Sequence, residues 1–326
     1  MSGCTETGKP RIAILMAVYE PRMDWLREQL LSLDAQTYPN LMLYVQDDCS
    51  PTVPFEEIQS CVQDCIRAFP YEIKRNEKNL GSNGTFELLT QEAEGEYFAY
   101  CDQDDVWLPE KLEVLEKAIM ETGALLVCSD MFIIDGNGKQ KADSITKVRR
   151  HHVFRSGKNL AEELIFHNFV TGCTMLACAE QAKAAIPFCP YMVHDHYLAL
   201  WCAVRGSVQS LLQPLIRYRI HGGNQTGLLA GVTDKTSYGK VRIDSMLKRV
   251  QWLQEHFDDV NMQGILAEAV TWANARHENW HTGKNKKTVW KYRRFSMLPS
   301  VFEIFATVMP ETLFKKMLFL GKHNIV

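Results

Sequence analysis

Three aspartates, Asp102, Asp104 and Asp105, stand close together in the segment YCDQDDVW. Carboxylates at this spacing repel one another unless a cation or hydrogen-bond donors offset their charge. Hard divalent cations such as Mg²⁺ bind a few protein carboxylates together with substrate phosphates. The cluster therefore suggests a metal ion that bridges the protein to a diphosphate. The alternative is structural, because an aspartate just ahead of Pro109 would cap a helix that begins there.

Polar segments also follow several predicted strands. Apolar runs of strand type alternate with segments of helical periodicity, and they lie at 11–18, 41–46, 71–74, 96–101 and 124–129. This alternation predicts crossover units and a mainly parallel sheet. The first four strands lead into AVYEP (17–21), QDDCS (46–50), NLGSN (79–83) and CDQDD (101–105). Ligands of such sheets bind beyond the carboxyl ends of the strands, so these segments predict one shared site.

Two common phosphate-binding motifs are missing. The sequence has no Gly-Lys-Ser/Thr loop of the P-loop type and no Gly-x-Gly-x-x-Gly after the first strand. This disfavours a P-loop NTPase and an NAD-dependent dehydrogenase. The turn from Gly81 to Gly84 would let the backbone approach a ligand, and a helix start capped by Asn83 explains the same residues equally well.

A series of segments resembles the family 2 glycosyltransferases, and most closely the rhamnosyltransferase-like branch that builds bacterial surface polysaccharides. Besides AVYEP and the aspartate cluster, the series comprises QDDCSP (46–51), NLGSNGTFE (79–87), YCDQDDVWLPEKL (100–112), TGCTM (171–175), VHDHYLAL (193–200) and YRIHGGNQTG (218–227). It covers roughly residues 10–228 in order. The resemblance implies a GT-A (Rossmann-like) mixed α/β sheet flanked by helices. It also implies transfer of a sugar from a nucleotide-diphosphate donor with inversion.

The resemblance assigns roles to individual positions. Asp195 would be the catalytic base, and Asp104 would hold a Mg or Mn cation against the diphosphate, with His221 approaching the metal. The nucleotide sugar would be bound by Ala17, Tyr19, Glu20, Asp47, Asp48, Asn79, Gly81, Asn83, Asp102 and Arg219. Glu20 stands where the family often has Asn, and the arginine often found after the Gly-rich turn is missing. The sequence therefore does not specify the donor, which is dTDP-rhamnose, UDP-glucose, UDP-galactose or another nucleotide sugar.

Two other functions remain open at this point. One is a metal-dependent hydrolase, because the imidazoles in the set His194, Asp195, His196 and His221 are zinc ligands of the usual type. The other is a non-catalytic protein that binds nucleotide sugars. Retention of both Asp104 and Asp195 favours an enzyme over such a binding protein.

Composition restricts the class of protein further. The chain has 326 residues, of which 46% are hydrophobic and 23% charged, as in a soluble globular enzyme. A formal net charge of -3 argues against a general nucleic-acid binder. Ten scattered cysteines without a Cys-x-x-Cys pair, together with an N-terminus that lacks an apolar signal segment, predict a cytoplasmic protein with reduced thiols. No apolar stretch reaches the roughly 20 residues that a spanning helix needs.

The C-terminal part differs from the rest. The alternation of strands and helices loosens after Asp130, and from about Lys240 the pattern is helical to the end. This predicts a catalytic domain over 1–235 and a helical region over 236–326. From Lys284 onward the chain has nine Lys or Arg against two Glu, interleaved with aromatic residues. Such a segment suits peripheral contact with an anionic membrane surface at the inner face of the plasma membrane. The alternative is a helical cap on the catalytic domain. A glycan or lipid-linked glycan acceptor, such as this family extends, would be met at that surface.

Overall fold

The computed structural model describes residues 8–149, 151–221 and 231–322. The chain forms two compact units. The first comprises Met1–Leu160, Asn168–Phe188 and Val193–His221, and the second comprises Ala161–His167, Cys189–Met192 and Gly222–Val326. Each unit is described separately below.

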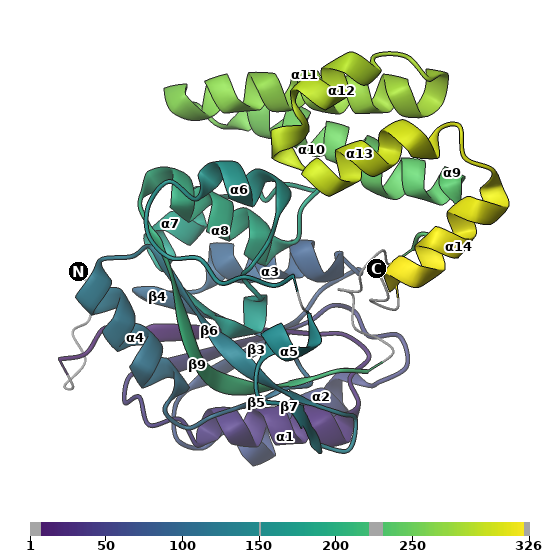
Figure 1. The fold of residues 1–326 in the computed structure, drawn as a ribbon. Coiled ribbons are helices and arrows are strands. Elements are labelled where there is room, and N and C mark those ends of the chain that lie inside the picture. Colours follow the sequence, from purple (N-terminus) through teal and green to yellow (C-terminus); the bar gives the residue numbers. More distant parts are fainter. Residues whose placement is uncertain (1–7, 150, 222–230, 323–326) are drawn as a thin grey trace. The chain divides into compact units, whose positions relative to one another are not determined.

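The first unit begins with strands and helices in strict alternation (Figure 1). The elements are β1 (Ile12–Val18), α1 (Met23–Asp34), β2 (Leu41–Asp47), α2 (Phe55–Cys65), β3 (Tyr71–Arg75), α3 (Gly81–Glu92) and β4 (Tyr97–Cys101). The first four predicted strands are therefore confirmed to within one residue. Helices α1 and α2 lie on one face of the sheet, and α3 lies on the other.

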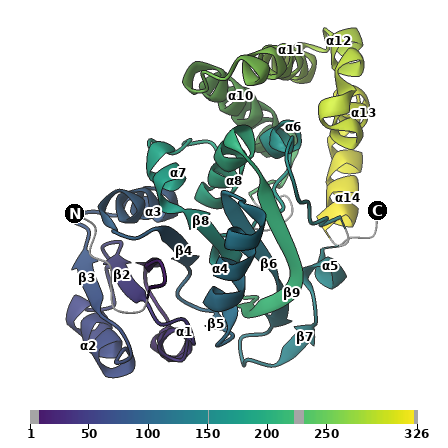
Figure 2. The same cartoon turned by 90° about the vertical axis from the view of Figure 1, so that its left-hand side faces the viewer.

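The second half of the first unit completes a mixed sheet. Its elements are β5 (Val106–Trp107), α4 (Lys111–Thr122), β6 (Leu126–Ile134), β7 (Gln140–Ala142), α5 (Ile145–Val148), η1 (Gly172–Thr174), β8 (Met175–Cys178), α7 (Ala179–Ala184), α8 (His194–Arg205) and β9 (Val208–Arg219). The strand order is β3-β2-β1-β4-β8-β6-β9-β5, with β7 paired to β6. Strand β8 runs antiparallel to both β4 and β6, whereas β9 runs parallel to β6 (Figure 2). The predicted α/β sheet flanked by helices is confirmed.

The order of the strands fixes where a ligand can bind. From β1 the chain builds β2 and β3 on one side, and it then crosses to place β4 on the other side of β1. Crossover helices leave in opposite directions at such a switch point, which opens a crevice beyond the carboxyl ends of the two strands. The residues after Val18 and after Cys101 therefore face the same crevice.

Two details of the sequence prediction need correction. The fifth predicted strand, 124–129, continues to Ile134, because it stays paired with β9 on one side and with β7 beyond its middle. Helix α4 starts at Lys111 after an N-cap at Glu110, so Pro109 precedes the helix instead of opening it. No side-chain hydrogen bond caps this helix, so the structural alternative, in which one of the nearby aspartates is its cap, is wrong.

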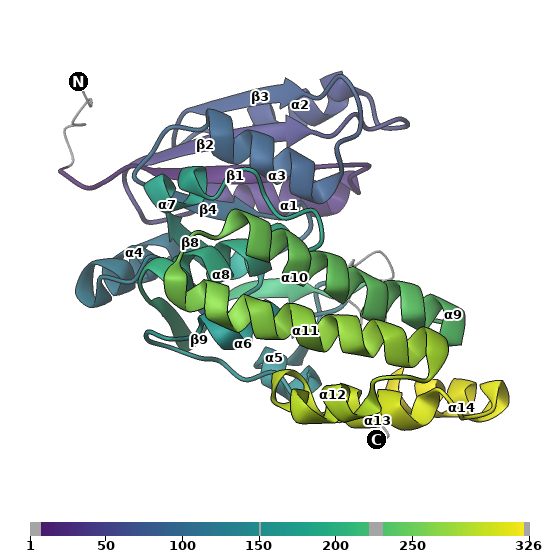
Figure 3. The same ribbon diagram turned by 90° about the horizontal axis from the view of Figure 1, so that it is seen from above.

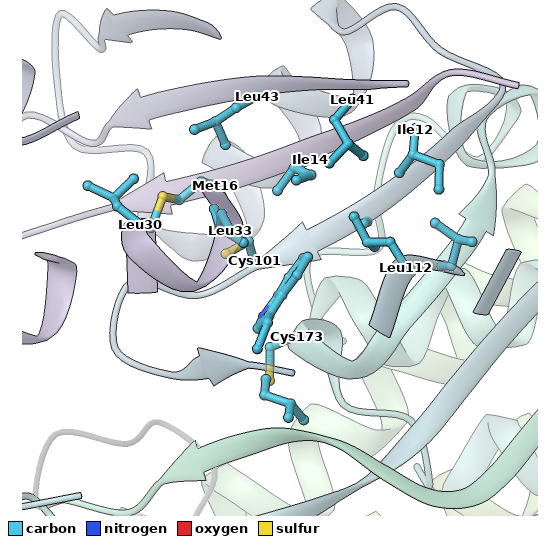
Figure 4. Close-up of a cluster of buried hydrophobic side chains, with 14 of the residues drawn as sticks. Ile12, Ile14, Met16, Leu30, Leu33, Leu41, Leu43, Cys101, Leu112 and Cys173 are labelled. Carbon is cyan, nitrogen blue, oxygen red and sulfur yellow. The ribbon is translucent and has the colours of Figure 1, made fainter. Parts of the chain in front are cut away.

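The core of the first unit lies between the sheet and its helices. Residues 12–16 of β1 are fully buried on both faces of the sheet, as the continuous apolar run predicts. Figure 4 shows Ile14 and Met16 of β1 beside Leu30 and Leu33 of α1. None of the nine cysteines in the described ranges forms a disulfide.

The second unit is helical. It contains α6 (Ala161–Phe166), α9 (Lys235–Tyr238), a π-helical turn (Gly239–Asp244), α10 (Ser245–His256), α11 (Val260–Thr282), α12 (Lys286–Lys291), η3 (Arg293–Phe295), α13 (Met297–Ala306) and α14 (Glu311–Lys322). Helices α10 and α11 lie side by side (Figure 3). A buried ion pair between Arg276 and Glu303 joins α11 to α13. None of the helices in the described segments combines the length and the apolar character that crossing a bilayer requires.

Candidate active site

The ends of β1 and β4 are fastened together by one side chain. Gln103 follows β4, and its Oε1 accepts a hydrogen bond from the backbone N–H of Tyr19 at 2.8 Å. Its Nε2 donates to the carbonyl oxygen of Tyr19 at 3.0 Å. This reciprocal pair bridges the switch point, so the aspartate segment stays in register with the end of β1. The sequence pattern does not predict this role of Gln103, although its position between Asp102 and Asp104 is a signal.

The predicted metal ligands meet in this crevice. The Oδ2 atom of Asp104 lies 2.6 Å from Nε2 of His221, although the two residues are far apart in the sequence. Strand β9 ends at Arg219 and so carries His221 to the aspartate segment. A carboxylate and an imidazole together suit Mn²⁺. They also suit Mg²⁺ if water and phosphate oxygens complete its coordination shell.

Arg219 lies beneath this pair. Its side chain is 1% exposed. The backbone N–H donates to Oδ1 of Asp105 at 2.9 Å, Nε donates to the carbonyl oxygen of Asp104 at 2.7 Å, and the guanidinium pairs with Glu28. The described contacts therefore place Arg219 as a support for the backbone that carries Asp104.

The other two aspartates of the cluster are deeper. Burial, together with the negative charges of Asp104 and Asp195, raises the pKa of Asp102 to about 7. Burial also raises the pKa of Asp105 well above its usual range. Atoms of Asp102, Asp105 and Cys173 lie within 4.8 Å of one another. Nearby, burial lowers the pKa of Lys111 to about 7, while its Nζ donates to the carbonyl oxygen of Cys173 at 2.6 Å.

Asp195 lies in the first turn of α8, where Val193 is the N-cap. Its Oδ2 accepts a hydrogen bond from the backbone N–H of Gly172 at 2.9 Å. Its Oδ1 accepts from Nδ2 of Asn168 at 3.1 Å and from the N–H of His196. Burial raises the pKa of Asp195 to about 6, against the lowering effect of these donors. The N-cap of α8 is Val193, so Asp195 does not cap this helix, and two of its three donors come from outside the helix.

The histidines on either side of Asp195 are both buried. Burial lowers the pKa of His194 to about 3, and its ring packs on Phe86 with centroids 4.1 Å apart. A side chain at Gly172 would meet Nε2 of His194 at 2.7 Å, so only glycine fits there. Within the described ranges, the hydrolase set of His194, Asp195, His196 and His221 provides no group of three atoms close enough to share a metal.

The glycine-rich segment forms the start of α3 and is held by Asp48. The carboxylate accepts hydrogen bonds from the N–H groups of Leu80 and Gly81 at 2.7 and 2.9 Å and from Nδ2 of Asn76 at 2.7 Å. Gly81 has a φ of +72°, which only glycine adopts without strain. Asn79 contributes its Oδ1 as a further acceptor for the Gly81 N–H.

Asn83 connects this segment to Asp195. It lies inside the first turn of α3 and does not cap that helix, whose N-cap is Leu80. Its Oδ1 instead accepts a hydrogen bond from the backbone N–H of His194 at 2.9 Å. The start of α8 is therefore fixed by a side chain from α3, a contact between residues that no local pattern in the sequence indicates.

The remaining predicted nucleotide contacts differ in exposure. Asp47 is fully buried, and its Oδ1 accepts from the hydroxyl of Ser50 at 2.5 Å, with Arg75 3.4 Å from its Oδ2. The carboxylate of Glu20 accepts from the backbone N–H and the hydroxyl of Thr52. Both carboxylates thus hold the loop after β2.

Two further residues line the end of β1. Ala17 is half-buried within the strand, and Tyr19 is 46% exposed. Of the residues predicted after β1, Tyr19 offers the most free surface to a ligand.

Comparison with known proteins bears on the family and the fold of the chain. Residues 13–179 match the model of the protein family described as glycosyl transferase family 2. The chain is 25% identical over 237 residues to an uncharacterized glycosyltransferase of Nostoc sp., covering 69% of each protein. It is 26% identical over 113 residues to TuaG of Bacillus subtilis, a putative teichuronic acid biosynthesis glycosyltransferase, covering 35% of this chain and 43% of TuaG.

Solved structures resemble the fold over most of the chain. S. aureus TarS, residues 1–349 in complex with UDP-GlcNAc, superposes with a TM-score of 0.57 at 14% identity and covers 87% of this chain and 81% of TarS. The mannosyltransferase PcManGT from Pyrobaculum calidifontis, in complex with GDP-Man and Mn²⁺, gives a TM-score of 0.54 at 13% identity, covering 97% and 81%. The expected GT-A-like fold is confirmed. With a family match that spans just over half of its length, the chain belongs to glycosyltransferase family 2 and is a glycosyltransferase.

Proposed function

We propose that this glycosyltransferase transfers a sugar from a nucleotide-diphosphate donor to a hydroxyl of a growing surface glycan, with inversion and with the help of a divalent cation. One observation carries the proposal. Asp104 is paired with His221, Asp102 lies within 4.8 Å of the Cys173 thiol, and the N–H of Gly172, the residue before Cys173, binds Asp195. A candidate metal ligand and a candidate base thus share one crevice at the switch point of the sheet.

In this proposal Asp104 and His221 hold Mn²⁺ or Mg²⁺. The cation would offset the charge that develops on the departing nucleotide diphosphate. Arg219 keeps the Asp104 backbone in place through its bond to the Asp104 carbonyl oxygen. The mannosyltransferase with a similar fold was crystallised with Mn²⁺, which supports this choice of ion.

Asp195 takes the proton from the acceptor hydroxyl. A base is most effective when its pKa lies near the working pH, and burial raises that of Asp195 to about 6. The Gly172 N–H and Asn168 amide orient the carboxylate. Inversion needs one base and no protein nucleophile, so a single carboxylate at this position is sufficient.

The donor is a UDP- or dTDP-sugar in this proposal, bound by the residues assigned to it above from Ala17 to Asp102. Among them, Glu20 and Asp47 would act through the loop after β2 that their carboxylates hold. The complex of TarS with UDP-GlcNAc supports a uridine nucleotide. The complex of the mannosyltransferase with GDP-Man is the reason to test guanosine nucleotides as well. The teichuronic acid role given to TuaG supports a cell-envelope glycan as acceptor. We assign catalysis to residues 1–235 and place the enzyme at the cytoplasmic face of the membrane, which residues 236–326 would contact.

The test is a donor screen with purified protein and Mn²⁺, with release of the free nucleotide and transfer to a glycan acceptor as readouts. UDP-, dTDP- and GDP-sugars are compared, and a dTDP-rhamnose-specific signal would place the enzyme in the rhamnosyltransferase-like branch. If no donor gives metal-dependent transfer, the proposed reaction is wrong.

Asp104→Ala is the first informative variant. Loss of this carboxylate removes a metal ligand, so Mn²⁺ should no longer strengthen nucleotide binding, as measured by isothermal titration calorimetry. Asp143→Ala, which removes an exposed carboxylate of the same unit, should keep the wild-type metal dependence. If Asp104→Ala binds UDP with the same response to Mn²⁺, Asp104 is not a metal ligand.

A further inference from the structure

Two histidines of the helical unit face the same carboxylate. His277 and His281 lie one turn apart on α11, with ring centroids 4.5 Å apart. The Nε2 atoms lie 3.6 and 3.2 Å from Oδ1 of Asp244, respectively. We propose that Asp244, His277 and His281 form a second metal site, which binds a first-row transition-metal ion such as Zn²⁺ or Co²⁺. The proposal is independent of the glycosyl transfer site.

The separations match those between ligands of one ion. Imidazole nitrogens and carboxylate oxygens bind Zn²⁺ at about 2.0–2.1 Å, which puts neighbouring ligands of a tetrahedron about 3.3 Å apart. The two measured N–O distances lie on either side of that value, and all three ligand atoms lie within 4.8 Å of one another. Two imidazoles favour Zn²⁺, Co²⁺ or Ni²⁺ over Mg²⁺, which prefers oxygen ligands throughout.

A local irregularity of the fold brings Asp244 to the histidines. The helical stretch from α9 to α10 contains a π-helical turn, Gly239–Asp244, and Asp244 is its last residue. Turns of this kind inside helices occur frequently at functional sites. At the other end of the turn, a side chain at Gly239 would meet the indole of Trp280 at 2.6 Å, so glycine permits the close approach of α11.

The site opens onto a cavity. A pocket of about 450 Å³ is lined by Lys235, Thr236, Lys240, Asp244, Trp280, His281 and Thr307, two of which are proposed ligands. Three protein ligands leave a fourth tetrahedral position free, as in zinc sites that bind water or a substrate. The pocket provides room for that ligand, and its two lysines favour an anion. The chemistry of the site therefore points to a metal-bound water or a small anion in the pocket.

The simpler alternative is a hydrogen bond between the His281 imidazole and Asp244, with Nε2 of His277 beyond hydrogen-bond distance at 3.6 Å from the same oxygen. Both interpretations fit the distances, and they differ in metal binding. Untagged full-length protein, stripped with a chelator, is titrated with Co²⁺ and followed by the visible absorption of tetrahedral cobalt. We expect one such cobalt per chain, displaced by Zn²⁺ and not by Mg²⁺. Absence of the absorption band would overturn the proposal.

Variants of the two histidines test whether the cobalt absorption band comes from this site. His277→Ala and His281→Ala should each weaken Co²⁺ binding by about 10-fold to 100-fold. Each should also remove the rise in melting temperature that the ion causes. His256→Ala is the matched control, because this exposed histidine of α10 stacks on Trp252 away from the three ligands. Asp104→Ala should also keep the band. A double variant of His277 and His281 with the wild-type cobalt spectrum would contradict the assignment.

Discussion

The environment of Asp195 sets its acidity through two opposing effects. Hydrogen bonds from Gly172, His196 and Asn168 stabilise the charged form, whereas burial favours the neutral form and dominates. The pKa is therefore raised to about 6. A carboxylate in this state is still ionised at neutral pH, yet it is a stronger base than an exposed aspartate.

Replacement of Asp195 by Asn tests its proposed role. The amide cannot accept a proton, so we expect kcat to fall about 10²–10⁴-fold. Both oxygens of Asp195 accept hydrogen bonds, so the amide also loses one acceptor, and the loss of kcat must be normalised to folded protein. In the wild type kcat should rise with pH up to about 6 and then level off, since the base must be deprotonated. A variant with unchanged turnover and pH profile would show that another group is the base.

For individual residues, the sequence predicted which side chains of the site lie together better than it predicted their burial and hydrogen-bond partners. The pairing of Asp104 with His221 followed from the resemblance, because each belongs to a motif of the family. The burial of Arg219 and the protein donors that occupy Asp47 and Glu20 did not follow, because they depend on β9 and on the loop after β2. A motif identifies residue types, whereas the sheet determines which atoms remain free for a ligand.

Among the secondary structure elements, α3 and α8 are coupled through Asn83. Asn83→Ala removes the acceptor of the His194 N–H, and such capping interactions contribute about 1 kcal/mol. We expect the free energy of unfolding to fall by roughly that amount and kcat to fall as well, because Asp195 follows His194 directly. Chemical denaturation and steady-state kinetics measure the two effects. Asn83→Asp keeps an oxygen acceptor and should restore both, and a failure to do so would argue for a role of the Asn83 amide itself.

Helices α12 to α14 expose apolar side chains next to basic ones. Leu298 and Phe305, seven residues apart and hence on one face of α13, are 79% and 62% exposed. Arg293 stacks on Trp290, which is itself half-exposed. Apolar residues beside cations suit a membrane surface, where each basic residue contributes about 1 kcal/mol near anionic lipids.

Vesicle sedimentation tests this surface. We expect the protein to bind vesicles that contain phosphatidylglycerol and not pure phosphatidylcholine, and Leu298→Glu with Phe305→Glu should abolish the binding. Leu212→Glu alters an equally exposed leucine of β9 in the other unit and serves as the control. Equal binding to both kinds of vesicle, or none to either, would leave these helices without a membrane role.

Local periodicity predicted the elements well wherever they form βαβ units. The run at 11–18 is buried on both faces of the sheet from Ile12 to Met16, so its hydrophobicity is unbroken and easily recognised. In the run at 41–46, Met42 and Tyr44 are half-buried and apolar as well, so this strand is recognised in the same way. Beyond Asp130 the signal failed, because β6 continues with a register shift and β8 enters antiparallel between β4 and β6. Such pairings join residues that are far apart in the sequence, so a local pattern of residues cannot predict them.

Across the whole molecule, the active site concentrates carboxylates in a place that water reaches poorly. Asp102 and Asp195 have pKa values raised by burial to about 7 and about 6, and their mutual repulsion contributes to the first of these. In the unfolded chain both groups would titrate near 4. Between about pH 4 and pH 7 the folded protein therefore holds protons that the unfolded chain has lost, which makes folding pH-dependent.

The sign of this dependence gives the last prediction. The stabilisation from these two groups is complete below about pH 4 and is lost as the pH rises through about 6 and then about 7. Burial lowers the pKa of His194 to about 3 and that of Lys111 to about 7, so these two groups act in the opposite direction. From pH 5 to pH 8 the wild type should therefore lose stability relative to a variant that lacks both carboxylates. Urea denaturation at both values measures the change. The double variant Asp102→Asn/Asp195→Asn has no carboxylate to ionise there, so its stability should fall less, or rise more, between the two pH values than that of the wild type. Asp64→Asn, at an exposed site of α2, should keep the wild-type slope. An unchanged slope in the double variant would mean that both carboxylates ionise in the folded protein as easily as in the unfolded chain.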